Sequence, residues 1–184
     1  MRKDFGAKPW VLPQPVLIIG TYDENDKPNA MNAAWGGTYD FDKIIVSVSK
    51  HKSTENIKIH KAFSVSFATK STVIPADFVG IVSGNNEPNK IEKSGLHPVP
   101  SSKVHAPLFN EFPVVMECEL DKYDEEEGIL IGNIINVSVD EKYIKGGKID
   151  FEALEIIAFD PTTSKYRLVK EPVADAFKCG QALK

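Results

Sequence analysis

Positive charge gathers in residues 50–61, KHKSTENIKIHK, of an otherwise acidic sequence. Only Glu55 opposes the lysines of this segment, which are Lys50, Lys52, Lys58 and Lys61. Ser53 and Thr54 precede a helical pattern, and the start of a helix exposes backbone N–H groups that hydroxyls can cap. Hydroxyls, N–H groups and cations together suit a phosphate dianion. The alternative is a solvated helix face in which Ser53 or Thr54 only caps the helix.

A second polar segment, residues 80–90 (GIVSGNNEPNK), contains Ser83, Gly84 and Lys90. Gly84 permits either a positive φ or a close approach of the backbone to a ligand. The same composition is also typical of an ordinary turn. The segment therefore leaves a ligand-binding loop and a plain turn as alternatives.

Residues 28–37, PNAMNAAWGG, carry small and polar side chains where a strand would normally carry Val and Ile. Asn29 and Asn32 offer hydrogen-bond donors and acceptors, and Trp35 offers a broad apolar face with one N–H. Alanines leave a strand surface shallow, so a flat heteroaromatic ring could lie against the backbone. Composition equally allows a strand packed closely beneath a helix, with Trp35 in the core.

Other kinds of site lack support in the sequence. There is no P-loop, no GxGxxG after a strand and no GxSxG, so an enzyme of this sequence would delegate its chemistry to a cofactor. Cys118 and Cys179 lie far apart, which favours two reduced thiols. The histidines have no HxxxH spacing, and we expect surface side chains rather than metal ligands at His51, His60, His97 and His105.

Short β-branched runs separated by turns predict a mainly β protein. The predicted strands are residues 15–22, 43–49, 63–69, 113–123, 128–139 and 155–160. The first run and the PNAMNAAWGG stretch form a hairpin candidate around the turn at 23–28. Three short helices are expected, at residues 53–61, 72–83 and 89–95. These elements predict an antiparallel barrel or sandwich with small peripheral helices.

Length and charge narrow the class of protein. The 184 residues predict a single domain over 1–184, and the net charge of −4 argues against nucleic-acid binding. No apolar run could cross a bilayer, and the first residues lack the apolar region of a signal peptide. With two reduced thiols, the expected location is the cytoplasm.

Three segments in this order resemble the flavin reductase-like family with the FMN-binding split barrel, and within it the flavoredoxin group. They are PVLIIGTYDENDKPNAMNAAW, VSVSKHKSTENI and GIVSGNNEPNKIEKSGL. The resemblance runs from about residue 10 to about residue 140, with weaker agreement through IIAFDP. It implies an antiparallel split β-barrel with a few short peripheral helices, non-covalently bound FMN, and a homodimer with each cofactor near the subunit interface.

The resemblance also implies which positions would contact FMN. The isoalloxazine ring would lie against Asn29, Ala30, Met31, Asn32 and Trp35, with Ser49 and Lys50 on its other side. The 5′-phosphate would be held by Lys52, Ser53 and Thr54, with Asn56 nearby. The ribityl chain or phosphate would be reached by Ser83, Gly84 and Lys90, within one subunit or across the dimer, and Phe159 would lie near the ring. The sequence departs from the family at His51, where an Arg-like residue is expected.

Three functional hypotheses follow. The first is an FMN-dependent oxidoreductase that passes electrons from NAD(P)H to free flavin or another acceptor. The second is a flavoredoxin-type electron-transfer protein that works between partner proteins without its own nucleotide site. In it the acidic turn at 124–128, DEEEG, would dock a basic partner, although such a turn can simply be solvated. The third is a split barrel that binds another ligand or none.

Overall fold

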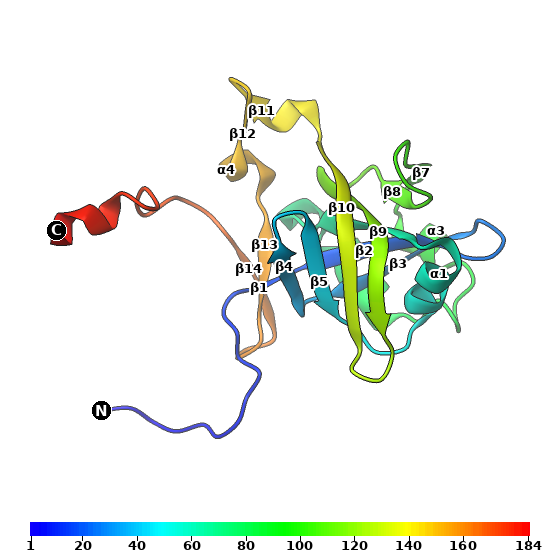
Figure 1. Cartoon of the computed structure of the whole chain (residues 1–184), viewed down its shortest axis with the longest axis horizontal. Coiled ribbons are helices and arrows are strands. Elements are labelled where there is room, and N and C mark those ends of the chain that lie inside the picture. Colours follow the sequence, from blue (N-terminus) through cyan, green and yellow to red (C-terminus); the bar gives the residue numbers. More distant parts are fainter.

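Antiparallel strands dominate the structure, a computed structural model that describes residues 1–184 (Figure 1). Its main sheet has seven strands in the order β3-β2-β6-β9-β10-β5-β4, and all of its pairings are antiparallel. These strands are β2 (Leu17–Tyr22), β3 (Pro28–Ala33), β4 (Gly36–Asp40), β5 (Lys43–Ser47), β6 (Ala62–Phe67), β9 (Val114–Asp124) and β10 (Ile129–Val139). The predicted strands within residues 15–139 and the hairpin around the 23–28 turn are confirmed.

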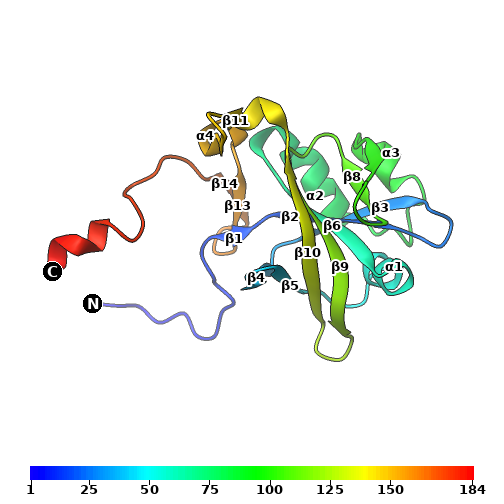
Figure 2. The ribbon, with the colours of Figure 1, turned by 45° about the horizontal axis from the view of Figure 1, so that its top comes forward.

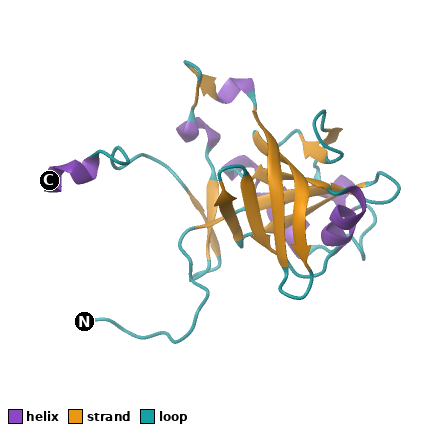
Figure 3. Cartoon of the chain, viewed as in Figure 1, coloured by secondary structure: helices purple, strands orange, loops and turns teal.

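The two edge strands of this sheet, β3 and β4, are consecutive in the chain. Only Ala34 and Trp35 separate them, so the sheet must curl until its edges meet at that point. The edges are not hydrogen-bonded to each other as strands, and the curled sheet is an antiparallel barrel left open along one seam (Figure 3). The predicted split β-barrel with short peripheral helices is confirmed.

Strand β2 is buried on both faces, which explains its continuous apolar run. Ile18 packs outward into a cluster beneath α2 and α3, whereas Leu17 and Ile19 point into the barrel. The outer cluster includes Val79, Ile91 and Phe109 among its eleven buried residues. Because side chains alternate along a strand, one short segment contributes to both halves of the core.

Four short helices lie around the sheet: α1 (Lys52–His60), α2 (Val73–Ile81), α3 (Lys90–Ser94) and α4 (Phe151–Leu154). The three predicted helices correspond to α1, α2 and α3, and Gly95 ends α3 at φ +73°. The predicted cap of α1 is wrong, because the N-cap is His51. Its N–H donates to Oγ1 of Thr54 at 2.9 Å, so Thr54 closes the first turn from inside the helix.

Smaller strands complete the fold. Strand β13 (Ile157–Asp160), part of the predicted 155–160 strand, pairs with β1 (Gln14–Pro15) and β14 (Lys165–Leu168). The other short pairs are β7 (Pro98–Pro100) with β8 (Pro107–Phe109), and β11 (Ile144–Lys145) with β12 (Lys148–Ile149). Both terminal segments extend away from the barrel on the same side (Figure 2). None of the helices has the length and apolar character required to span a membrane.

Candidate functional site

The largest cavity, about 490 Å³, lies where the barrel edges meet. We call it the seam cavity, and it is lined by Met31, Asn32, Ala33, Ala34, Trp35, Ser47, Val48, Ser49, Lys50, His51, Glu125, Glu126, Glu127 and Gly128. Its walls are the end of β3, the link into β4, the segment from β5 to α1, and the β9–β10 turn. Its volume falls within the range of small-molecule sites, about 300–1,000 Å³.

An edge strand forms one wall of this cavity. Strand β3 pairs only with β2, so every second residue directs its backbone N–H and C=O away from the sheet. Ala33 lines the cavity, whereas Ala30 is fully buried in the outer cluster beneath α2. Trp35 is 56% exposed at the cavity, so a Trp35 in the core is ruled out. The stretch therefore combines both sequence interpretations, a strand closely covered by a helix and a shallow open edge.

The Gly84 turn packs directly against β3. Asn29 donates from Nδ2 to Oγ of Ser53 at 2.8 Å, and this pair is buried. A Cβ atom on Gly84 would lie 2.6 Å from Oδ1 of Asn29 and 3.6 Å from Cγ of Lys52. Gly84 is thus required for close approach and not for a positive φ. Three segments that are far apart in sequence meet here, as the resemblance implies for a shared ligand.

Thr54 and Asn56 both form hydrogen bonds within the fold, and their role as cofactor contacts stays a prediction. Thr54 is almost fully buried, and its hydroxyl donates to the His51 carbonyl at 2.9 Å. Asn56 donates to Oγ1 of Thr21 at 3.0 Å beneath α1. The structure thus gives both residues internal hydrogen bonds at the helix that carries Ser53.

The lysines of residues 50–61 are better neutralised than their sequence neighbours indicate. Lys52 Nζ lies 3.7 Å from Oδ2 of Asp23 and 3.6 Å from Oε2 of Glu24. Lys50 Nζ lies 3.5 Å from Oε1 of Glu125. The expectation that only Glu55 opposes these lysines is wrong, because the β2–β3 and β9–β10 turns bring further carboxylates to them.

Lys90 differs from Lys50 and Lys52, which are paired with carboxylates. Its side chain begins on α3 and is 4% exposed, and it forms no ion pair. Burial lowers the pKa of this ammonium group to about 8. A buried cation without an anion is energetically unfavourable. An anion bound beside Lys90 would offset this cost.

Several predicted positions do not meet at the seam cavity. Phe159 lies on β13 and lines a separate cavity of about 340 Å³ with Leu12, Pro13, Ala158, Asp160, Thr162 and Arg167. Lys52, Ser53, Ser83 and Gly84 adjoin Asn29 but do not line the seam cavity. These positions remain predictions as cofactor contacts.

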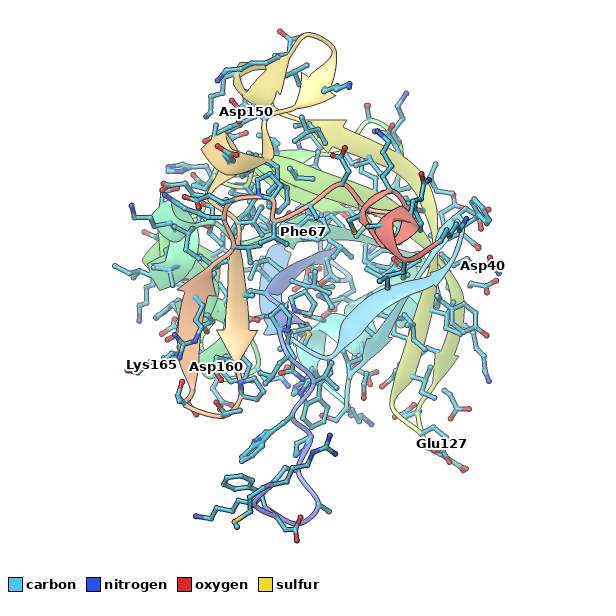
Figure 4. All side chains as sticks on the ribbon, turned by 90° about the vertical axis from the view of Figure 1, so that its left-hand side faces the viewer. Asp40, Phe67, Glu127, Asp150, Asp160 and Lys165 are labelled. Atoms are coloured by element: carbon cyan, nitrogen blue, oxygen red, sulfur yellow. The ribbon has the colours of Figure 1, made fainter.

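Three glutamates form an acidic side of the cavity that no local pattern in the sequence indicates. Glu125, Glu126 and Glu127 line it from the tip of the β9–β10 hairpin, where Figure 4 labels Glu127. Sequence reasoning treated this turn as a docking tip or a solvated turn, since nothing local links it to residues 31–35. His51, expected as a surface side chain and as a departure from the family, also lines the cavity, with its Nε2 3.2 Å from Oγ of Ser49.

Neither cysteine lies in this site. Cys118 is completely buried on β9, and its burial raises the pKa of the thiol to about 12. It therefore stays protonated at neutral pH and packs as a small apolar side chain. Cys179 is exposed in the C-terminal segment.

Comparison with known proteins agrees with this geometry. The flavin reductase like domain model matches residues 11–149. The flavoredoxin of Desulfovibrio vulgaris (Miyazaki F) superposes with a TM-score of 0.93 and 36% identity, covering 98% of this chain and 100% of that one. An FMN-binding domain of a flavin reductases-like enzyme from Shewanella baltica OS155 gives a TM-score of 0.80 at 19% identity, over 88% of this chain and 89% of that one. An uncharacterised protein of Pyrococcus abyssi (strain GE5 / Orsay) is 28% identical over 130 residues, 67% of this chain and 73% of its own.

The curled antiparallel sheet with its open seam defines a split-barrel protein. The family model covers most of the chain, and the D. vulgaris protein matches it almost end to end. The chain belongs to the flavin reductase-like family.

Proposed function

We propose that this protein is an FMN-dependent oxidoreductase that takes electrons from NAD(P)H and passes them to free flavin or another acceptor. When bound, FMN supplies hydride and single-electron transfer, chemistry that the side chains lack. The protein would bind and orient the cofactor. Family membership and the seam cavity support this proposal.

The residues present fit FMN in three respects. The edge of β3 offers backbone donors and acceptors beside the small Ala33, as the polar edge of a flat ring requires. A Cβ atom would fill the cradle at Gly84, which brings that turn against Asn29 and Ser53. Lys90 is a buried cation lacking a paired carboxylate, and a phosphate group would supply the missing charge.

In this proposal each segment has a separate task. Ala33 and Trp35 hold the ring and limit water access on the β3 side, and Ser49 with Lys50 faces them across the cavity. The first turn of α1 offers unpaired backbone N–H groups to the phosphate beside Ser53. Orientation of the cofactor thus depends mostly on backbone groups, which a side-chain substitution cannot remove.

The observation that carries the proposal is the cavity at the β3–β4 edge, next to the contact of Asn29, Ser53 and Gly84. Titration of the purified protein with FMN, followed by its visible spectrum, tests cofactor binding. Steady-state oxidation of NADH and NADPH by the FMN-loaded protein tests the donor. No reduction by either nucleotide would contradict the reductase, and no uptake of FMN would contradict both flavin proposals in favour of another ligand.

One observation favours a second candidate, a flavoredoxin-type electron carrier between proteins. The glutamates at 125–127 project from the tip of a long hairpin and also line the seam cavity. A basic redox partner docked there would lie close to the bound cofactor. This candidate predicts fast reduction by a reduced redox protein, weakened by salt, and slow reduction by NAD(P)H.

The proposal includes a homodimer in the cytoplasm. The terminal segments carry exposed large apolar side chains, among them Phe5, Trp10, Val173 and Phe177. An apolar groove of about 400 Å³ between β1, α4 and β13 could receive such side chains from a second copy. Sedimentation or light scattering giving a monomer mass would contradict the dimer. The free thiols Cys118 and Cys179 support a reducing compartment.

A further inference from the structure

Three potential metal ligands meet at the end of the barrel where the β2–β3 turn, α1 and the β7–β8 loop come together. Asp26 lies in the turn, His60 is the last residue of α1, and His105 lies in the loop between β7 and β8. One ligand atom from each lies within 4.8 Å of the others. None of the three lines the seam cavity.

A hydrogen bond to the backbone already orients the His60 ring. Nε2 of His60 lies 2.8 Å from the carbonyl oxygen of Asp23, which can only accept, so this nitrogen carries the proton. In neutral His60 the lone pair is then left on Nδ1. A metal-binding histidine commonly has this arrangement, with its other N–H donated to a backbone carbonyl.

The Asp26 carboxylate is positioned by the turn that carries it. Oδ1 of Asp23 accepts the N–H groups of Asn25 and Lys27 at 2.9 and 3.0 Å, which fixes the turn around Asp26. Oδ1 of Asp26 lies 2.8 Å from Nε2 of His105, and the ring centroids of His60 and His105 are 4.6 Å apart. Tetrahedral Zn²⁺ with bonds of about 2.0–2.1 Å separates its ligand atoms by about 3.3 Å. Drawing the three ligand atoms from within 4.8 Å of one another to about 3.3 Å would place an ion between them.

We propose that Asp26, His60 and His105 bind a divalent transition-metal ion of the Zn²⁺ type. Two imidazoles and one carboxylate suit such an ion and leave a fourth position for water. On binding, the ion takes the place of the proton between His105 Nε2 and Asp26: in neutral His105 that proton moves to Nδ1, and in protonated His105 it is released to solvent. The bound ion ties the β2–β3 hairpin to α1, and it acts as a structural clamp away from the seam cavity.

Calorimetric titration of the purified full-length protein with ZnCl₂ tests this site. All samples carry Cys179→Ser, so that the exposed thiol does not compete for the metal. The parent is compared with Asp26→Asn, His60→Ala and His105→Ala. Asp26 has φ +58°, a conformation that Asn adopts readily, so that variant is expected to fold. The matched control is His97→Ala, which removes a histidine paired with a different carboxylate, Glu111.

We expect one Zn²⁺ per chain, with affinity reduced at least tenfold in each of the three variants and unchanged in His97→Ala. Zn²⁺ is also expected to raise the melting temperature of the parent but not of Asp26→Asn, because a ligand stabilises the state that binds it. No binding by the parent would overturn the proposal. Equal affinity in parent and variants would also overturn it, since the ion would then lie elsewhere. Neither outcome bears on FMN binding, which is measured separately.

Discussion

Strands β2 and β3 are hydrogen-bonded neighbours, yet they are built from different residues. Strand β2, LIIGTY, packs large side chains on both faces, whereas β3, PNAMNA, carries small and polar ones. No residue of either strand is exposed, although five of six are buried in β2 and three of six in β3, so exposure explains only part of the difference. The difference lies in what each strand touches. Strand β2 has hydrogen-bonded strands on both edges and packed side chains on both faces, while β3 has an unpaired edge along the seam cavity.

This comparison shows that an apolar pattern indicates a strand surrounded by other side chains, and that its absence does not indicate a loop. A strand can give up branched side chains where a helix backbone lies close. A Cβ atom added to Gly80 of α2 would lie 2.9 Å from Cβ of Asn32. Alanines at such places allow the helix on one face and the cavity on the other. The variants below test this contrast between β2 as a packing strand and β3 as the cavity edge, beginning with the variant expected to lose most stability.

Ile18→Ala removes a fully buried side chain from β2. We expect the free energy of unfolding to fall by about 2–5 kcal/mol, because a cavity opens in the outer cluster. Urea denaturation measures this loss. The control, Val137→Ala on exposed β10 surface, is expected to change it by less than about 0.5 kcal/mol. A loss of similar size in both variants would contradict the central role of β2.

Lys90→Met removes the buried charge from α3, a helix that packs against β3. The folded-state pKa of about 8 lies below the ordinary value of about 10.4, so folding is opposed by the buried charge below pH 8. This penalty, at most about 3 kcal/mol, disappears as pH rises from about 8 to 10.4, and stability from this group rises with pH.

We therefore expect Lys90→Met to stabilise the FMN-free protein at pH 7 and to flatten this pH dependence, while FMN affinity falls. Chemical denaturation at pH 7 and 9.5 and FMN titration measure the two effects. Unchanged FMN affinity would show that Lys90 holds no part of the cofactor.

Ala30→Ile and Ala33→Ile add the same volume to opposite faces of β3. We expect Ala30→Ile to lower stability by about 1–3 kcal/mol through overpacking beneath α2, with little change in FMN affinity. Ala33 lines the seam cavity and also packs with Leu17 and Ile19 inside the barrel, so Ala33→Ile is expected to weaken FMN binding more than tenfold and to lower stability as well. Thermal melting and FMN titration separate the two. Retention of FMN by both variants would overturn the proposed role of the stretch.

Gly84→Ala tests the closest approach at the site. Its Cβ atom would press on Oδ1 of Asn29 and disturb the bond from Asn29 to Ser53. We expect about a tenfold weaker affinity for FMN, about 1.4 kcal/mol, with the fold retained. Gly37→Ala on β4 is the control, since no atom lies within 4 Å of its added Cβ. Equal affinity in the two variants would remove the Gly84 turn from the proposed site.

Most elements could be predicted locally. The strand runs around β2, β5, β6, β9 and β10 were found because β-branched residues cluster there, and Gly95 marked the end of α3. Strand β4 was missed, because GGTYD has neither the alternation nor the apolar content of a strand. It is held by pairing with β5, with Gly36 opposite Val46. The extent of the single domain over residues 1–184 stays a prediction.

The candidate site was predictable in its residue types and less so in its contacts. Asn29, Ser53 and Gly84 were predicted together only through the family resemblance, and the structure brings them into contact. The pairing of Glu125 with Lys50 left no local signal, since it depends on how far the β9–β10 hairpin reaches. The meeting of Asp26, His60 and His105 likewise left no local signal, since it depends on how the β2–β3 turn, α1 and the β7–β8 loop pack together.

Propensity, turn residues and side-chain type act over a few positions, so the long strands, three of the helices and the available chemistry could be predicted from local sequence. The sequence by itself also determined the family, through three segments in a fixed order. Only the tertiary structure decided which alanine faces the cavity, which lysine lacks an anion, and which histidines meet. Those outcomes depend on the curl of the seven-stranded sheet, and the curl arises from pairings between residues as distant as Ser47 and Ile129.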